Sequence, residues 1–173
     1  MDEERFWAVI DAFDWSHEGD DAAVLRPATE ALVALPSEEI QAFKDLLAAK
    51  LYALDTREHA RYAFWGRADP DDGDAYISAD VFLYIRCVVV VNGRAFYEAV
   101  LAEPRRMPSE LEFEALLWLA DGAHIAKTGA ETQSLTPVSW ESFSNLEGWR
   151  PNRHTRPGWA TSDRVPPMNR RPA

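Results

Sequence analysis

The sequence predicts an all-α protein: a single compact, bundle-like domain of about six or seven helices, followed by an irregular tail rich in proline and arginine. Apolar side chains recur at three- and four-residue steps along most of the first 130 residues, which is the spacing of one helix face. With 47% hydrophobic residues, the 173-residue chain holds enough apolar material to bury one core. No segment is convincing as a strand, and no repeat of solenoid period is present.

The first two helices are expected before residue 36. Phe6 and Ile10 share a helix face that follows an acidic first turn, and acids suit the positive end of a helix dipole. The second helix spans residues 20–34, where Pro27 requires that the helix either start near residue 26 or kink.

Two further helical segments follow. Ser37 is a good N-cap for a helix whose apolar face runs from Ile40 to Leu54. Residues 56–65 are another helix or a bent continuation of the same one. Residues 66–77, rich in aspartate, proline and glycine, are the clearest interior loop.

The most apolar segment, residues 78–92, is expected to be the buried central helix. The four consecutive valines at 88–91 favour a strand by local propensity. However, Ser78 at its start and Gly93 just after its end are typical helix boundaries. A helix that is apolar nearly all round belongs in the middle of a domain.

Three segments complete the predicted domain. A short helix covers about residues 94–102. Ser109 and Glu112 have capping-box spacing, so we expect them to start a further helix that ends at Gly129. Residues 130–148 are expected to be loop and partial helix.

Several polar residues with fixed spacings carry a resemblance to a known family. The central motif is Ser78-x-Asp80-x-Phe82-x-Tyr84-Ile85-Arg86, then Gly93-Arg94-x-x-Tyr97-Glu98-x-x-Leu101-x-x-Pro104. Two earlier motifs are Glu4-Arg5-Phe6-Trp7-x-x-Ile10 and Leu32-x-x-Leu35-Pro36-x-Glu38-Glu39-Ile40-x-x-Phe43. Over about residues 1–130 the chain resembles the bacterial family catalogued as domain of unknown function 4240. It differs from the family pattern at Ala75-Tyr76 and Val88, where a Gly-Gly pair and a tryptophan are expected. The resemblance implies a small, mostly helical bacterial protein and brings no catalytic residues.

The charge of the chain is acidic and unevenly distributed. The formal net charge is −11; residues 150–173 hold six arginines and one aspartate, or +5, so the preceding 149 residues carry −16. Five of the eleven prolines lie in the same C-terminal stretch, which excludes a regular helix there. We therefore expect a helical domain at residues 1–148 and a basic, proline-rich tail at 149–173.

This charge distribution argues against several classes of partner. An acidic body does not suit nucleic acid or an anionic membrane surface, and no apolar run approaches the roughly 20 residues that span a bilayer. The acidic N-terminus is unlike a secretory signal, so we expect a cytoplasmic protein. Nucleic acid is expected only through the tail, where arginines are interleaved with Trp149 and Trp159. Docking of the tail on its own acidic domain is favoured, and a partner protein is another possible target.

The candidate ligand-binding residues centre on the helix at 78–92. Asp80 and Tyr84 project from one face, whereas Arg86 points about 240° further round than Asp80. An arginine in so apolar a helix must find a partner or reach solvent. We favour a buried polar network that fixes helix register; the alternative is a pocket that clamps a small anionic ligand. The candidate residues for such a pocket are Asp80, Tyr84, Arg86, Tyr97, Trp118 and His124.

No cofactor or metal is expected. Two carboxylate–histidine pairs share helix faces but lack the Glu-x-x-His pattern of helical metal sites; they are Asp55 with His59 and Asp121 with His124. The acidic loop at 69–74 fails the EF-hand register. Cys87 has no paired histidine, so it is expected to be a core residue rather than a nucleophile. No phosphate-binding, dinucleotide-binding or hydrolase motif is present.

Without an assembled catalytic set, the sequence favours a non-enzymatic binding or interaction module. Its acidic helical surface would engage a basic protein partner. The alternative is a small-molecule binding protein or enzyme with a polar pocket beside the helix at 78–92.

Overall fold

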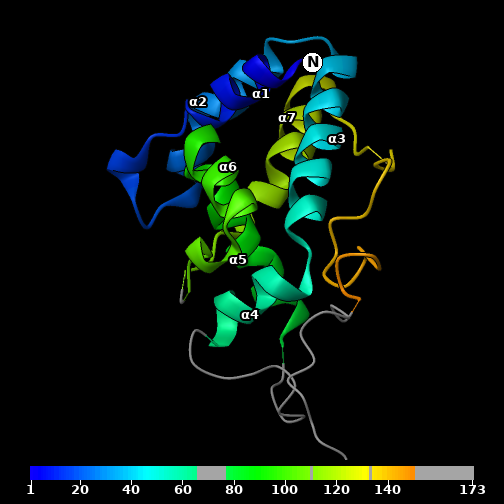
Figure 1. The fold of residues 1–173 in the computed structure, drawn as a ribbon. Coiled ribbons are helices and arrows are strands. Elements are labelled where there is room, and N and C mark those ends of the chain that lie inside the picture. The colour runs from blue at the N-terminus through cyan, green and yellow to red at the C-terminus, as the bar shows by residue number, and fades with distance from the viewer. Residues whose placement is uncertain (66–76, 110, 133, 151–173) are drawn as a thin grey trace, which may run out of the picture.

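The computed structural model describes residues 1–65, 77–109, 111–132 and 134–150. These residues form seven α-helices and three short 3-10 helices, with no strand among them, which confirms the predicted all-α class (Figure 1). The acidic loop considered for calcium lies outside the described residues, as does the tail after Arg150. The boundary expected after residue 148 stays a prediction.

The N-terminal helices differ from expectation only at their boundaries. Helix α1 spans Glu3–Ile10, and helix α2 spans Asp21–Val33. The side chain of Asp20 accepts a hydrogen bond from the backbone N–H of Ala23, so α2 begins before Pro27 and runs through it. The short helix η1, Trp15–His17, lies between them.

Helices α3 and α4 are separate. Helix α3 spans Ser37–Leu54, so Ser37 is its first residue rather than its N-cap. Asp55 then adopts a non-helical backbone conformation, and helix α4 begins after it and covers Arg57–Trp65. Of the two alternatives expected for residues 56–65, the structure has the separate helix rather than the bent continuation.

Helix α5, Ala79–Val91, occupies the centre of the domain. The Ser78 hydroxyl accepts a hydrogen bond from the backbone N–H of Val81, as expected for an N-cap. Nine of the thirteen residues of α5 are buried, including the four consecutive valines at 88–91. Figure 1 shows α5 between α3 and helix α6, Arg94–Ala102, with α4 below.

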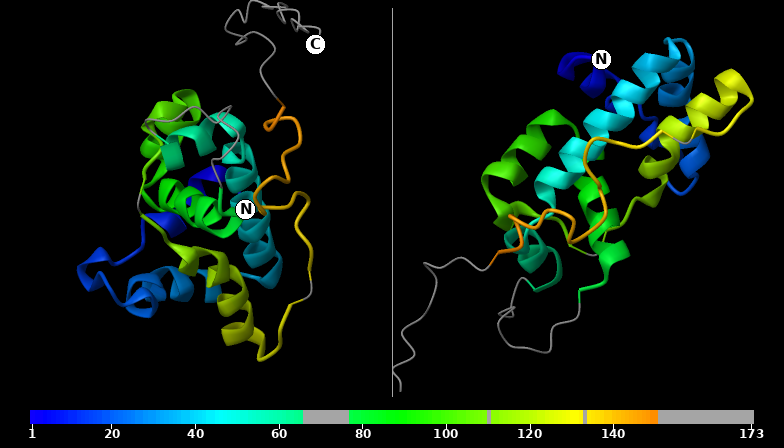
Figure 2. Two further views of the ribbon diagram at one scale, coloured as in Figure 1. Left: turned by 90° about the horizontal axis from the view of Figure 1, so that it is seen from below. Right: turned by 90° about the vertical axis from the view of Figure 1, so that its right-hand side faces the viewer.

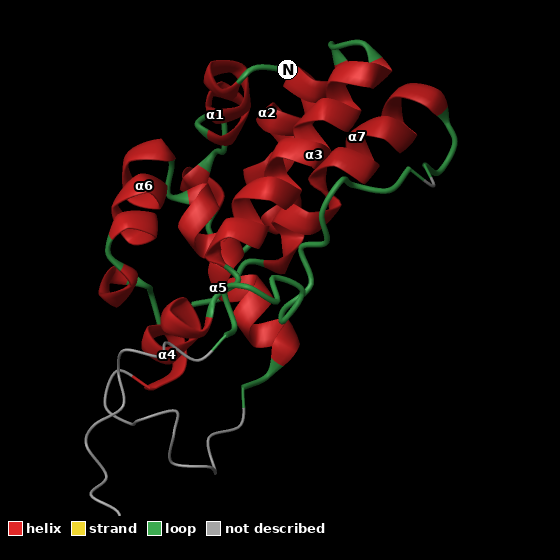
Figure 3. Ribbon diagram, turned by 45° about the vertical axis from the view of Figure 1, so that its right-hand side comes forward, coloured by secondary structure: helices red, strands yellow, loops and turns green. Residues whose placement is uncertain are grey.

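The predicted helix start at Ser109 and Glu112 is wrong. Residues 111–113 are not helical, and the helical segment begins with η3, Glu114–Trp118, which leads into α7, Leu119–Thr128. The backbone N–H of Phe113 donates to the carbonyl of Tyr84 across the side of α5. Burial of the Phe113 ring therefore outweighs the local capping pattern. Helix α7 packs against α2 and α3 (Figure 3) and ends at Gly129, as predicted.

After α7 the chain returns along α3 toward α4 (Figure 2, right). We call residues 138–150 the strap. The partial helix expected at 130–148 is not found among the described residues, which form turns and bends there. No helix in the described part of the chain is long and apolar enough to cross a membrane.

Candidate functional site

The buried face of α5 places Arg86 in the protein interior. Its Nη1 donates to the carbonyl of Leu51 at 2.7 Å, near the end of α3. Its Nη2 donates to the carbonyl of Trp140 at 2.9 Å and to the Ser142 hydroxyl at 2.8 Å, both in the strap. The guanidinium carbon lies 4.8 Å from the centre of the Phe82 ring. Arg86 therefore joins three segments of the chain.

Asp55 is the second buried charged residue that contacts the strap. Its carboxylate accepts hydrogen bonds from the backbone N–H groups of Phe143 and Asn145, at 3.0 and 2.9 Å. It also accepts one from Nε1 of Trp149 at 2.8 Å. Both Asp55 and Arg86 are fully buried. A buried carboxylate is tolerated when several donors satisfy it, as these do.

The charge of Arg86 persists despite its burial. Burial lowers the pKa of Arg86 to about 10, and the nearby negative charge of Asp55 opposes this shift. The guanidinium is therefore protonated at neutral pH, and the two buried side chains are oppositely charged. The contacts of Arg86 with Leu51, Trp140 and Ser142 are of the kind expected if it belongs to a buried polar network.

The strap fits closely against the junction of α3 and α4. The carbonyl of Gly148 accepts a hydrogen bond from the backbone N–H of Arg57 at 3.0 Å. A Cβ atom at position 148 would lie 2.8 Å from Cγ2 of Thr56 and 2.9 Å from the carbonyl oxygen of Asp55. Only glycine fits there without displacing its neighbours.

The other candidate residues from the sequence lie elsewhere. Tyr97 is buried, its hydroxyl donates to the carbonyl of Lys50 at 3.2 Å, and burial raises its pKa. Trp118, at the end of η3, is 64% exposed. His124 is half-buried on α7. Tyr97 and Arg86 thus donate to consecutive carbonyls near the end of α3, those of Lys50 and Leu51. Within the candidate set only Asp80 and Tyr84 share a helix face.

The two carboxylate–histidine pairs have other partners. Asp121 forms an ion pair with Lys44 at 2.7 Å. Nε2 of His59 donates to the carbonyl of Val100 at 3.3 Å, so its Nδ1 accepts a hydrogen bond from the Thr56 hydroxyl at 2.7 Å. Burial lowers the pKa of His59. Within the described ranges, no three histidine, cysteine or acidic side chains are grouped to hold a metal ion.

Cys87 is a core residue. Its side chain is fully buried, and burial raises the pKa of the thiol to about 12. The thiolate needed for nucleophilic chemistry is therefore negligible at neutral pH.

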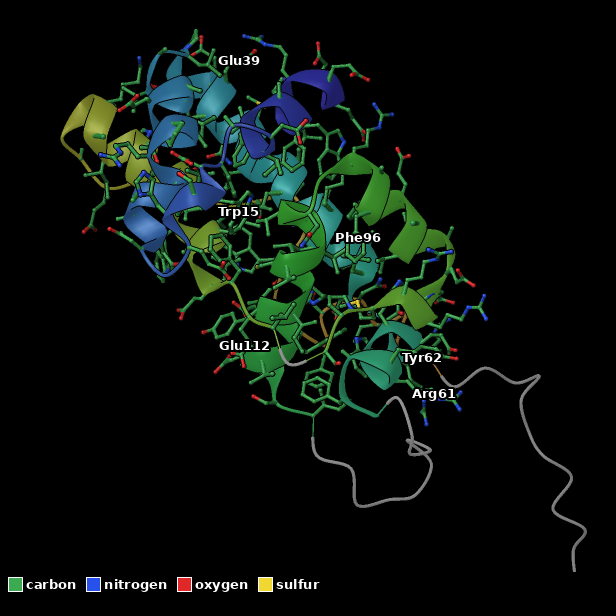
Figure 4. The ribbon with its side chains drawn as sticks, turned by 90° about the vertical axis from the view of Figure 1, so that its left-hand side faces the viewer. Trp15, Glu39, Arg61, Tyr62, Phe96 and Glu112 are labelled. Carbon is green, nitrogen blue, oxygen red and sulfur yellow. The ribbon has the colours of Figure 1, made fainter. Side chains whose placement is uncertain are left out.

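An exposed surface beside α5 contains Asp80 and Tyr84. The side chain of Trp15 is 46% exposed, and its ring centre lies 5.4 Å from that of Phe113. The hydrogen bond from Phe113 to the Tyr84 carbonyl, at 3.3 Å, fixes this segment against α5. Figure 4 shows Trp15 and Glu112 on the same face of the molecule. We call the following five residues the aromatic–acidic surface: Trp15, Asp80, Tyr84, Glu112 and Glu114.

The carboxylates of the aromatic–acidic surface are not neutralised. Asp80, Glu112 and Glu114 are exposed and form no ion pair with any described residue. Partial burial, the charge and hydrogen bond of Glu114, and the charge of Asp80 raise the pKa of Tyr84. By contrast, two acids of α1 form ion pairs with α3 and α6. The aromatic–acidic surface thus combines an exposed indole with unpaired negative charge.

Sequence reasoning missed Asp55 as a structural residue and Trp15 as a surface residue. Asp55 was considered only together with His59, four residues away, because its strap partners lie 88–94 residues later in the chain. Trp15 stands alone between two helices, and no local pattern connects it to Phe113. One signal was available in the sequence: Asp55 directly follows a long apolar helix. A carboxylate buried at such a position needs hydrogen-bond donors from elsewhere in the chain.

Comparison with known proteins gives one match. The family model described as "Protein of unknown function (DUF4240)" matches residues 1–126. No curated protein and no solved structure matches the chain. The matched part contains α1 to α6 and most of α7, and it ends before the strap. Because it covers more than half of the chain, this protein belongs to the DUF4240 family, as the motifs predicted.

Proposed function

We propose that this protein is a non-enzymatic interaction module whose aromatic–acidic surface binds a basic segment of a partner protein in the bacterial cytoplasm. The observation that carries this proposal is the contact between the exposed Trp15 ring and Phe113, whose two neighbours in the chain are the exposed acids Glu112 and Glu114. These acids and Asp80 have no ion-pair partner among the described residues. Such a surface matches the chemistry of arginine and lysine side chains.

The backbone explains why the carboxylates gather there. Residues 111–113 are not helical, and η3 begins at Glu114. Phe113 is buried, whereas its two neighbours Glu112 and Glu114 are exposed. The exposed indole of Trp15 can stack with a guanidinium of a basic segment, and the exposed carboxylates of Glu112 and Glu114 can accept hydrogen bonds from other donors of that segment.

The alternative function, a small-molecule site beside α5, has weaker support. Its central residue was Arg86, whose Nη atoms already donate to Leu51, Trp140 and Ser142. An arginine held in this way contributes to folding rather than to an anion site.

The proposal is tested by purifying the tagged full-length chain from its native host. The surface variant, Glu112→Lys/Glu114→Lys, reverses two carboxylates of the aromatic–acidic surface. The control variant, Glu30→Lys/Glu38→Lys, makes the same charge change at two exposed acids on α2 and α3. Figure 4 shows the neighbouring Glu39 at the opposite end of the molecule from Glu112.

We expect the wild-type chain and the control variant to retain a basic partner in stoichiometric amount, and the surface variant to lose it. Circular dichroism would confirm that all three chains are folded. Equal retention by the surface variant, or the absence of any stoichiometric partner, would refute the proposal.

A further inference from the structure

We propose that the arginine-rich end of this chain, residues 151–173, docks on the aromatic–acidic surface of its own domain and competes with other basic ligands. This inference deepens the proposed function, since it names a regulator of the same surface. It does not require that a partner protein exist.

Charge complementarity supports this occupant. Residues 151–173 contain five arginines and one aspartate, together with Trp159. Arg150, which precedes them, is already paired with Glu147 at 2.6 Å, so the unassigned positive charge begins at Arg153. The aromatic–acidic surface offers three carboxylates without an ion pair in the described structure.

The aromatic residues are also complementary. The exposed Trp15 ring can stack with a guanidinium of this segment or with the Trp159 ring. Five prolines in residues 151–173 restrict the backbone, which reduces the entropy lost when the segment binds.

The segment begins close to the helix that carries part of this surface and is long enough to reach it. The Trp149 ring lies 5.9 Å from that of Phe82, on the buried face of α5, so the segment begins beside the same helix on the side away from Asp80 and Tyr84. Twenty-three residues span up to ~80 Å when extended, whereas a domain of this size is about 40 Å across.

Tethering makes even a weak contact effective. A tethered segment has an effective concentration on the order of 1 mM, so a dissociation constant of about 0.5 mM or tighter lowers the apparent affinity of a competing ligand about threefold or more. Removing the positive charge of the segment should therefore strengthen the binding of a basic probe.

The first test uses nuclear magnetic resonance on the full-length chain. The tail variant carries glutamine in place of each arginine after Arg150, as Arg153→Gln, Arg156→Gln, Arg164→Gln, Arg170→Gln and Arg171→Gln. We expect the Trp15 indole N–H and the amides of Glu112 and Glu114 to differ between wild type and the tail variant at about 20 mM salt. The difference should vanish near 0.5 M salt, where screening is strong.

The amides of Glu30 and Glu38 are internal controls and should not change. Identical Trp15 and Glu112 signals in the two chains at low salt would overturn the inference. Equal changes at Glu30 and Glu38 would also overturn it, because they would indicate diffuse attraction rather than docking on the aromatic–acidic surface.

The second test measures competition. A synthetic peptide of residues 151–173 is titrated into the full-length wild type and into the tail variant. We expect at least threefold tighter binding to the tail variant, and at least tenfold weaker binding when Glu112→Lys/Glu114→Lys is added to that variant. Adding Glu30→Lys/Glu38→Lys should have less effect. Equal affinity for wild type and tail variant would contradict competition.

The two proposals fail in different ways. Suppose that the tail variant differs from wild type as expected while no host protein requires Glu112 and Glu114 for binding. In that case the proposed function fails, and the docking of residues 151–173 on their own domain stands. If a host partner requires those acids for binding but the tail variant behaves like wild type, the docking of residues 151–173 is refuted and the proposed function stands.

Discussion

Replacing Asp55 with alanine should detach the strap. The substitution removes the acceptor of four hydrogen bonds from the strap: from the backbone N–H groups of Phe143 and Asn145, the Ser144 hydroxyl and the Trp149 indole. It also removes the negative charge that helps keep the buried Arg86 protonated.

The expected loss is large for a single substitution. Each hydrogen bond to a charged acceptor contributes about 1.5–3 kcal/mol, but the strap donors can turn to water once released, so these values do not add. We take the equivalent of about two such hydrogen bonds, about 3–5 kcal/mol, as the expected decrease in the free energy of unfolding. For a chain of this size that corresponds to a decrease of about 6–20 °C in Tm.

Urea unfolding gives the free energy, and hydrogen exchange locates its origin. The amides of Phe143 and Asn145 should exchange faster in Asp55→Ala than in wild type. The matched control is Glu141→Ala, which removes an exposed carboxylate from the strap itself and should change the free energy of unfolding by no more than about 0.5 kcal/mol. If Asp55→Ala were as stable as Glu141→Ala and kept protection at both amides, the assigned role of Asp55 would be wrong.

Three further predictions concern the same interior. Gly148→Ala should lower the free energy of unfolding in urea by about 1–3 kcal/mol, because the new Cβ meets Thr56 and the Asp55 carbonyl; an unchanged midpoint would contradict the close fit. Burial lowers the pKa of His59 in the folded protein, so below about pH 6.5 this histidine binds a proton more readily in the unfolded chain than in the folded one. The free energy of unfolding should therefore decrease as the pH falls. At pH 5.5 the protonation of His59 in the unfolded chain lowers the free energy of unfolding by at most about 1.4 kcal/mol relative to neutral pH. Urea unfolding of His59→Gln should lack this part of the pH dependence. Cys87, with its thiol pKa raised to about 12, should resist a thiol reagent in the native protein and react when denaturant is added; rapid native reaction would show that the thiol is accessible.

The fold could be predicted where local signals agreed with tertiary packing. Ser78 and Gly93 bound the central helix correctly, since a cap and a turn glycine act over a few residues. The capping box at Ser109 and Glu112 does not start a helix, because the next residue, Phe113, is buried and its backbone N–H donates to the Tyr84 carbonyl of α5. Such a contact has no local sequence pattern.

The site was harder to predict because its contacts are long-range. The apolar surroundings of Arg86 were enough to predict that it needs a buried partner. They could not identify Trp140 and Ser142, which lie 54 and 56 residues away and contribute one backbone and one hydroxyl oxygen. Trp15 and Phe113 are farther apart still, and only the folded chain places them together.

The strap has a consequence for the evolution of the family. Asp55 and Arg86 lie within the matched residues 1–126, whereas their strap partners lie beyond them. A relative whose chain ended near residue 126 would leave both charges without these partners, a cost that selection would remove by substituting uncharged residues. We therefore expect the two charged positions and the strap to be inherited or lost together across the family.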